Sequence, residues 1–471
     1  MVRGGLLVSV PWTALFLPEP WSVPLLGLLS LVAGVLLVRD PEADRGVLLT
    51  VVAFTVCDLS PLSFDGSVVR LYQLSALLVL VVVMRRWRGL VRSVRGLPRL
   101  PMAVIGVIVT LTVLTPLSLL WTISPKDTLV ATVGQLSATG VLLVVTGSLS
   151  SGLIRAKEVL AALWTVASAS SLWAVVQFVA TILTPWDLAD AGGSGVTWPR
   201  PEGLMTESVW AALVAATGLA LTFVVRRDLP RLAAASAAVH IATVALVGSR
   251  AVLLGMAVAT VVCGAIAWRR YATPRRLLAV ATAAVVGVLV LALAAPAVLA
   301  RFDPRLIVGG ESGGDGGSAQ SRAVVYRLVA DELPPRLPLG GGAGSLNRLT
   351  TDPEIRERYI DGGQLNSGRG STNFFLGYTF DFGYLGALLS VALVVLVGVA
   401  AVRNARRDHG LTAFLATLFL VDFQFNNGFR FGFVNVLLGV VIAMTSVRRW
   451  PVRQDPDPPS ATGPAVGQRC A

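Results

Sequence analysis

The sequence is poor in charged residues, and it contains almost no lysine, histidine or cysteine. Only 14% of its 471 residues are charged, whereas soluble domains carry about a quarter, so the composition excludes a soluble globular enzyme. Hydrophobic residues make up 54% of the chain, and disordered chains are poor in them, so disorder is excluded as well. The cysteines Cys57, Cys263 and Cys470 show no disulfide or zinc-site spacing. The cysteines thus give no sign of a metal site, and we expect no metal and no cofactor.

Long apolar runs dominate the sequence instead. Runs of about 20 apolar residues cross a bilayer as helices. Together with a shorter run at residues 5–17, they predict an all-α, polytopic membrane protein with about 12–14 transmembrane helices. The clear runs begin near Trp21, Gly46, Leu71, Met102, Thr128, Val159, Leu204, Leu232, Ala251, Leu277, Thr372, Leu411 and Phe431.

The basic residues are almost all arginines, and they gather in short clusters between the apolar runs. The net charge is +12, and Lys126 and Lys157 are the only lysines. This spacing is typical of the positive-inside rule and argues against a nucleic-acid partner. It places both termini in the cytoplasm. The clusters lie at residues 85–99, 226–231, 269–276, 403–407 and 448–449.

One long polar segment interrupts the apolar runs, and the same alternation of sides places it outside the membrane. Within it, the stretch AQSRAVVYRLVADE at Ala319–Glu332 has helical spacing, and Pro334 and Pro335 end that helix. A loop this long is usually functional or disordered. We divide the chain into N-terminal transmembrane helices (1–100), a transmembrane core (101–300), a large extracytoplasmic loop (301–371), C-terminal transmembrane helices (372–450) and a disordered cytoplasmic tail (451–471).

Four arginines fall on the predicted outer side, against the general charge bias. They are Arg200, Arg250, Arg322 and Arg327. A guanidinium group meets phosphate oxygens with a planar fork and stays charged at physiological pH, so the group favours an anionic ligand. The alternative is that each arginine simply extends to the lipid headgroups at a helix end.

Six short segments follow one another in order between Leu117 and Gly386. They are Leu117–Pro125 (LSLLWTISP); Gln177; Arg200-Pro201-Glu202-Gly203; Ser249-Arg250; Ser321-Arg322 with Tyr326 and Pro338-Leu339-Gly340; and Asn373-Phe374-Phe375-Leu376 with Gly383 and Gly386. In this order, around a large outer loop, they resemble the motifs of the O-antigen ligase and polymerase family. The resemblance covers more than half of the chain.

The resemblance implies a metal-independent membrane glycosyltransferase. Such an enzyme takes a glycan from a polyprenyl pyrophosphate carrier and joins it to an acceptor hydroxyl on the outer face. The expected partners are this donor, a glycan acceptor and the lipid bilayer. Arg200, Arg250 and Arg322 then become candidates for a clamp on the pyrophosphate, with Arg327 as a fourth. Tyr326 and Asn373 become candidates for positioning the acceptor or the loop.

The sequence departs from the family at one position. The family has a histidine before the asparagine, whereas Thr372 precedes Asn373 here. His240 lies in an apolar run, where a core histidine with satisfied hydrogen bonds is the favoured interpretation, and His409 lies beside a cytoplasmic arginine cluster. Neither is therefore a counterpart of the family histidine.

The missing histidine leaves the general base open. Glu202, Glu207 and Asp381 are candidate bases, although the two glutamates are as well explained as partners of nearby arginines. Alternatively no base is used, because a pyrophosphate that leaves early tolerates a neutral nucleophile, or the chain has lost its activity.

Two further segments allow a structural and a functional interpretation. The glycines of residues 340–344 are favoured as a plain turn over a phosphate cradle, since the lysine of a P-loop is absent. Asp422–Asn427 (DFQFNN) either lines a cavity or forms a turn.

The rival function class is a transporter or flippase, which predicts charged pairs at the membrane midplane and an internal repeat. A non-catalytic family member is the third. Within the family, polymerase is slightly favoured over ligase, because the preference for Arg over Lys and the richness in Ala and Val suggest a GC-rich genome, such as an actinobacterial one, and no lipopolysaccharide core for a ligase.

Overall fold

The computed structural model shows a helical bundle. It describes residues 22–57, 62–64, 67–69, 75–184, 201–205, 207–271, 325–351, 373–405, 410–424 and 432–446, with the single positions 6, 9, 73, 354 and 408. The tail from residue 451, the run beginning at Leu277 and, apart from positions 6 and 9, the short run at 5–17 lie outside the described residues.

Nearly all the described residues are helical. The α-helices are α2 (Ser22–Arg39), α3 (Asp44–Phe54), α5 (Ala76–Arg95), α6 (Arg99–Leu117), α7 (Pro125–Ser150), α8 (Ala156–Leu183), α9 (Ser208–Val225), α10 (Pro230–Val247), α11 (Arg250–Tyr271), α16 (Leu346–Thr351), α18 (Phe374–Ala405), α19 (Leu411–Asp422) and α20 (Gly432–Ser446). The 3-10 turns are η2 (Pro41–Ala43), η3 (Ser118–Leu120) and η4 (Pro334–Arg336). Residues 325–332 form a further helix, called the loop helix below.

Six helical stretches in the described part are long and apolar enough to cross a bilayer, which confirms the predicted all-α, polytopic class. They are Arg99–Leu120, which joins α6 and η3, together with α7, α8, α9, α10 and α18. Shorter apolar helices are found at Arg250–Ile266, α19 and α20. The loop helix ends just before Pro334, as predicted.

The structure differs from the predicted pattern in its N-terminal part. The run beginning at Gly46 forms α3, whose 11 residues reach only about 16 Å, less than the roughly 30 Å of a bilayer core. A short antiparallel hairpin of β1 (Leu62–Phe64) and β2 (Ser67–Val69) follows it. The arginine cluster after residue 85 is not a connecting loop but the second half of α5.

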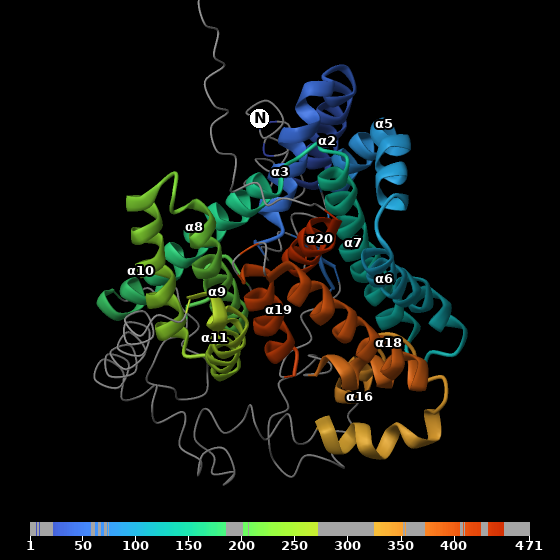
Figure 1. The fold of residues 1–471 in the computed structure, drawn as a ribbon. Helices are drawn as coiled ribbons and strands as arrows, with labels where there is room; N and C mark the ends of the chain where they lie inside the picture. Colours follow the sequence, from blue (N-terminus) through green and yellow to red (C-terminus); the bar gives the residue numbers. More distant parts are fainter. Residues whose placement is uncertain are drawn as a thin grey trace, which may run out of the picture.

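The two ends of the bundle carry different segments of the chain (Figure 1). The arginines of α5, the α9–α10 turn and the end of α18 lie at one end, because successive helices run in opposite directions. We call this the arginine end. The opposite end holds the α6–α7 turn, the loop helix, α16 and the start of α18, and we call it the loop end. The predicted grouping of arginine clusters on one side agrees with this arrangement.

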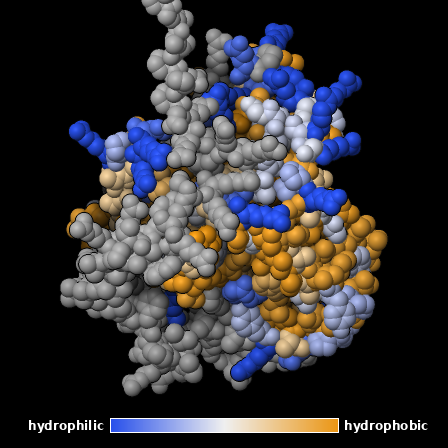
Figure 2. Space-filling view, viewed as in Figure 1, coloured by the Kyte–Doolittle hydropathy of each residue, from blue (hydrophilic) through white to orange (hydrophobic). Residues whose placement is uncertain are grey.

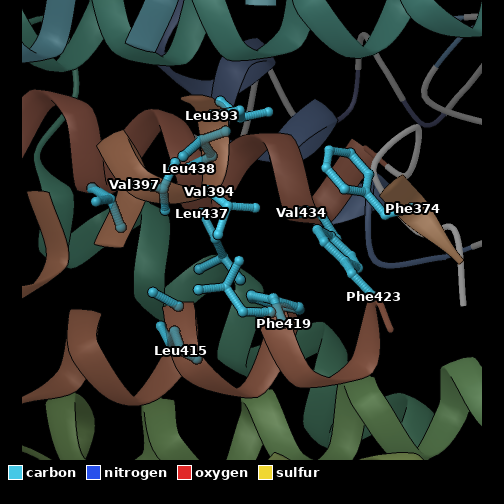
Figure 3. A pocket seen from close by; sticks show the side chains of 13 residues that line it. Phe374, Leu393, Val394, Val397, Leu415, Phe419, Phe423, Val434, Leu437 and Leu438 are labelled. Carbon is cyan, nitrogen blue, oxygen red and sulfur yellow. The ribbon is translucent and has the colours of Figure 1, made fainter. Parts of the chain in front are cut away.

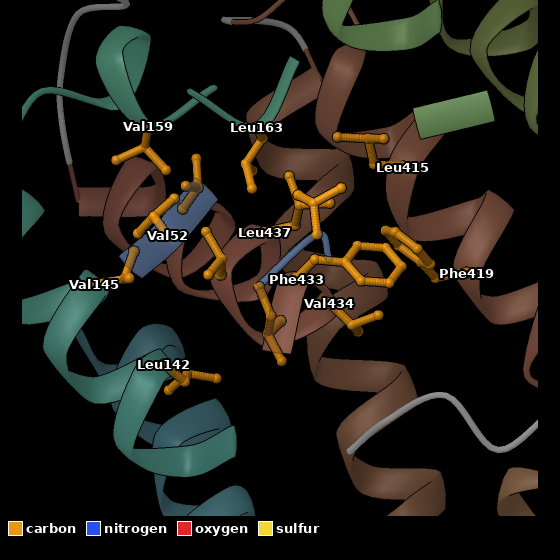
Figure 4. Packing of buried hydrophobic residues seen from close by; sticks show 14 of the residues in the cluster. Val52, Leu142, Val145, Val159, Leu163, Leu415, Phe419, Phe433, Val434 and Leu437 are labelled. Carbon is orange, nitrogen blue, oxygen red and sulfur yellow. The ribbon is translucent and has the colours of Figure 1, made fainter. Parts of the chain in front are cut away.

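Helix α20 lies at the centre of the core. All of its residues from Gly432 to Met444 are buried. It packs among α7, α8 and α19, and Figure 4 shows Phe433, Val434 and Leu437 pointing toward apolar side chains of these helices. The packing against α7 is close, since a Cβ atom on Gly439 would lie 3.2 Å from the carbonyl oxygen of Leu142. A helix surrounded by other helices must be apolar all round, which explains the composition of α20.

Apolar residues also cover the outside of the bundle. Figure 2 shows a hydrophobic band across the face formed by α6, α7 and α18, with hydrophilic residues gathered at the arginine end. On α18 the exposed residues recur every three or four positions, so they form a stripe suited to lipid contact. They are Leu388, Val391, Val395, Val399 and Val402.

A buried ion pair joins α3 to α5 at the arginine end. Asp44 is fully buried, and its two carboxylate oxygens lie 3.1 Å from Arg85 Nη1 and 2.9 Å from Arg86 Nε. Removing one partner of a buried pair leaves an uncompensated buried charge and costs about 3–5 kcal/mol. By contrast, the pair between Lys157 and Asp228 is exposed, and such pairs contribute about 0–1 kcal/mol.

We expect Asp44→Ala to lower the free energy of unfolding by about 2–4 kcal/mol, because two arginines lose their partner. The cost is below that of a fully buried pair because Arg85 and Arg86 are partly exposed. Asp228→Ala is the matched control and should change stability by less than about 1 kcal/mol. Thermal unfolding of the purified chain in one detergent compares the two. Equal shifts would show that the Asp44 pair adds nothing beyond an exposed one.

Candidate functional site

Helix α18 is broken near its start. Phe382 and Gly383 have non-helical dihedral angles, with φ of 60° at Gly383. The part after the break has about 22 residues and is long enough to cross a bilayer. The part before it forms a short helical segment at the loop end. A break of this kind leaves backbone carbonyls without their helical partners, so it needs donors from elsewhere in the chain.

A glycine-rich turn supplies these donors. The N–H of Gly341 donates to the carbonyl of Phe380 at 2.7 Å, and the N–H of Gly342 donates to the carbonyl of Asp381 at 3.0 Å. The side chain of Asp381 accepts a third bond, from the N–H of Gly344 at 3.1 Å. The turn therefore occupies the break in α18 and restores its hydrogen bonds.

The same turn rests on the connection between α6 and α7. The N–H of Ala343 donates to Ser118 Oγ at 3.0 Å, and Thr128 Oγ1 donates to the carbonyl of Ala343 at 2.8 Å. The N–H of Ile123 donates to the carbonyl of Gly341 at 3.0 Å. Three of the sequence motifs, 117–125, 338–344 and 373–386, thus meet at one place.

These contacts decide whether the glycine-rich segment is a plain turn or a phosphate cradle. The N–H groups of residues 341–344 all donate to groups within the protein, so they are not arranged as a phosphate cradle. The plain turn, the favoured interpretation, is correct. Gly340, Gly342 and Gly344 all have positive φ, where residues with a side chain are strained.

We expect Gly342→Ala to destabilise the loop end by at least about 1–3 kcal/mol. Its φ of 91° disfavours any side chain, and a Cβ atom there would overlap Thr122. Gly134→Ala on α7 is the control, since a Cβ atom there meets nothing within 4 Å. Limited proteolysis of the loop and thermal unfolding measure the effect. Unchanged protection in Gly342→Ala would show that the turn is not held by close contact.

Asp381, one of the candidate bases, is buried and bonded to the turn. Its carboxylate therefore has a structural role in holding the turn, and its role as a base stays a prediction. An amide oxygen can accept the bond from the Gly344 N–H as a carboxylate does, but an amide cannot act as a base.

Two variants separate these roles. If Asp381 only holds the turn, Asp381→Asn should keep most of the activity and stability. Asp381→Ala should lose about 1–3 kcal/mol, because the Gly344 N–H loses its acceptor. Glycan transfer and thermal unfolding are measured side by side. A folded but inactive Asp381→Asn variant would establish a base instead.

A second irregular segment packs against the middle of α8. Gln177 Oε1 accepts the N–H groups of Glu202 at 3.2 Å and Gly203 at 2.7 Å. Ser170 Oγ accepts the N–H of Leu204 at 3.0 Å. Because these groups bond to α8, α9 begins at Ser208 rather than at the predicted Leu204.

This segment brings Glu202 into the bundle. Ser170 lies 13 residues before the end of α8, which is about 20 Å along the helix axis. Gly203 approaches it so closely that a Cβ atom would lie 2.7 Å from Ser170 Oγ. Glu202 itself bonds to Gln177, about 9 Å before the end of α8, and is half-buried there. An ionisable residue drawn in among membrane helices points to function by default.

His240 lies fully buried beside the same stretch of α8. Its ring nitrogens contact two serine hydroxyls, Nδ1 with Ser171 Oγ at 2.9 Å and Nε2 with Ser168 Oγ at 3.2 Å. Gly218 on α9 leaves room for the ring. The interpretation of His240 as a core histidine with satisfied hydrogen bonds is confirmed.

The loop helix and the start of α18 enclose a groove of about 450 Å³. We call it the loop-helix groove. It contains both residues that the family resemblance predicts for positioning, Tyr326 and Asn373. Asn373 also caps α18, since its Oδ1 accepts the N–H of Leu376 at 3.1 Å. The other described residues that line the groove are Val329, Ala330, Leu333, Pro334, Leu337, Phe375, Leu376 and Thr379.

A smaller cavity of about 60 Å³ lies beneath, between α18, α19 and α20. Figure 3 shows its lining, which among the described residues is entirely apolar. Phe374 lines this cavity, whereas its neighbours Asn373 and Phe375 line the loop-helix groove. Successive residues of one motif thus face two different spaces.

Residues 235–391 match the family model described as O-antigen ligase. The chain carries an O-antigen ligase domain. The match covers about a third of the chain, from within α10 to within α18, and it confirms the family that the motifs resemble. This family contains glycosyltransferases that use lipid-linked glycans. No curated protein matches the chain.

The O-antigen ligase domain contains most of the predicted site residues. Arg250 is the first residue of α11 and is half-buried, and Arg327 is exposed on the loop helix. Neither forms an ion pair within the described ranges. Arg322 falls inside the domain and Arg200 before it, and both lie outside the described residues.

The two candidate glutamates precede the domain in the chain. Glu202 lies in the segment held by Gln177, and Glu207 is the residue before the first turn of α9. Helices α9 and α11 run in the same direction and are in contact, so Glu207 and Arg250 both lie at the loop end.

A buried polar cluster near the glycine-rich turn was not predicted from the sequence. Tyr378 donates its hydroxyl to Gln135 Oε1 at 3.1 Å, and Gln135 Nε2 donates to Thr139 Oγ1 at 3.4 Å. Thr112 joins the cluster through Thr139 at 2.6 Å. The cluster binds α18 to α6 and α7. Gln135 within an apolar run could have indicated the cluster, because a buried amide needs hydrogen-bond partners.

Proposed function

We propose that the chain is a membrane glycosyltransferase of the O-antigen ligase and polymerase type. It joins a glycan from a polyprenyl pyrophosphate carrier to an acceptor hydroxyl on the outer face of the plasma membrane, with both termini in the cytoplasm. The observation that carries this proposal is the convergence of motifs 117–125, 338–344 and 373–386 at the loop end, together with the domain match.

The proposed reaction is a displacement at the first carbon of the donor sugar. The acceptor hydroxyl oxygen forms a bond to this carbon, and the bond between the carbon and the pyrophosphate oxygen breaks. Polyprenyl pyrophosphate leaves with the bonding electrons, and the hydroxyl proton passes to a base or to water. Negative charge grows on the leaving group, so fixed positive charge beside it lowers the barrier.

Arg250 is the described residue best suited to supply this charge. It is half-buried and has no ion-pair partner in the described part of the chain, and a partly dry site strengthens its attraction for phosphate. Arg200 and Arg322 complete the proposed clamp, with Arg327 as a further member. Guanidinium groups suit a pyrophosphate because each meets two oxygens at once.

Among the candidate bases, the geometry favours Glu202. It enters the bundle on a segment fixed by two hydrogen bonds to Gln177, whereas Asp381 is bonded to the glycine-rich turn. Glu207 at the start of α9 is the second choice. Two alternatives remain because Thr372 replaces the family histidine: catalysis without a base, and a family member without activity.

A transporter or flippase is the rival function. It predicts charged residues buried in the middle of the helices. In the described ranges, the buried charged residues instead lie at helix ends, breaks or turns. They are Asp44, Asp381, Asp408 and Asp422. Asp381 and Asp408 accept backbone N–H groups, and Asp44 pairs with two arginines of α5.

We expect Arg250→Ala to lower glycan transfer by about 10²–10³-fold, the loss typical of removing one group that stabilises transition-state charge. Arg200→Ala and Arg322→Ala should behave alike. Arg336→Ala is the matched control, since this arginine already pairs with Glu332 at 2.8 Å. The assay follows transfer from a polyprenyl pyrophosphate donor by the purified chain. Full activity of all three variants would exclude the clamp.

Lipid extracts from a deletion strain test the function itself. Mass spectrometry should show polyprenyl-linked glycan accumulating on the outer face, as single repeat units for the favoured polymerase and as long chains for a ligase. Accumulation on the inner face would establish the flippase. An unchanged extract would exclude all three and leave a family member without this activity.

A further inference from the structure

The loop-helix groove is lined mainly by hydrocarbon. Seven of its ten described lining residues are apolar. The loop helix contributes one face to it. The lining residues on this side recur every three or four positions, as on one face of a helix; they are Tyr326, Val329, Ala330 and Leu333. The facing wall is the segment of α18 before the break. The groove is thus an elongated space between two helices.

The polar groups of the groove are mostly committed to the protein itself. Asn373 donates its amide to the carbonyl of Gln424 at 3.1 Å and accepts the N–H of Leu376. Thr379 donates its hydroxyl to the carbonyl of Phe375 at 2.8 Å. A glycan placed here would have many hydroxyl groups and few partners, and buried hydroxyls without partners are costly. A hydrocarbon chain meets no such cost and gains from burial.

The position of the groove fits the head end of a membrane lipid. One of its walls is the part of α18 just before the break, and the part of α18 after Gly383 is long enough to cross the bilayer by itself. None of its described lining residues is charged, so a phosphate would lie outside it. Arg327 is exposed on the loop helix next to Tyr326, which places a cation close to the groove.

We infer that the loop-helix groove binds the isoprenoid chain of the lipid carrier next to its phosphate, and not the glycan. This assignment rests on the proposed function for the identity of the lipid. It gives Tyr326 and Phe375 the task of contacting the first isoprene units. The glycan then lies on the other side of the phosphate, outside the groove.

The test is binding of geranylgeranyl phosphate to the purified full chain in detergent. Ala330→Trp fills the groove from an exposed position and should weaken binding by at least about tenfold. Ala235→Trp is the matched control, since Ala235 is exposed on α10 and does not line the groove. It should leave affinity unchanged. Inorganic phosphate and phosphatidylglycerol at equal concentration should not compete.

Three results of the binding experiment would overturn the inference, and a transfer assay adds a fourth. They are equal affinity in the wild type and Ala330→Trp, effective competition by phosphatidylglycerol, and an Ala330→Trp variant that loses affinity for a soluble glycan acceptor instead. Glycan transfer is measured separately. If the chain binds the lipid through the groove but shows no transfer activity, the proposed function is wrong and the assignment of the groove stands. If transfer is the same in the wild type and Ala330→Trp, only the assignment of the groove is wrong.

Discussion

Every backbone N–H and C=O group at membrane depth needs a partner inside the protein, and the loop end is built around this constraint. The break in α18 leaves the carbonyls of Phe380 and Asp381 without helical donors, and the glycine-rich turn provides them. The segment at 202–204 meets the same requirement through side chains of α8. Both irregular segments are therefore fixed in place beside the candidate site, and neither is a loose connection.

Much of the fold was predictable because membrane helices are set by local apolar composition. The apolar runs locate nearly every described helix, and Pro334 marks the end of the loop helix. The start of α9 was predicted four residues early because the hydrogen bonds that delay it come from Ser170 and Gln177, about 30 residues back. Partners at such a distance leave no local pattern to read.

The motifs of the candidate site could be predicted from the sequence, but the groove that they form could not. The resemblance pointed to Tyr326 and Asn373, which the structure brings to one groove. The apolar character of that groove comes from Val329, Leu333 and Phe375, which look like ordinary core residues in the sequence. A groove wall and a core differ only in what packs against them, and that depends on how the loop helix lies against α18.

The seat of the glycine-rich turn also has a consequence for biosynthesis. Ser118 and Thr128 are synthesised more than 200 residues before the turn that they bind. The turn also donates to carbonyls of α18, which is synthesised after it. Domains form from the N-terminus during synthesis, yet this site closes only when α18 emerges. A nascent chain halted in the large loop after Arg327 would hold every proposed clamp arginine but no working centre, so a ribosome that stalls there leaves an inactive chain in the membrane.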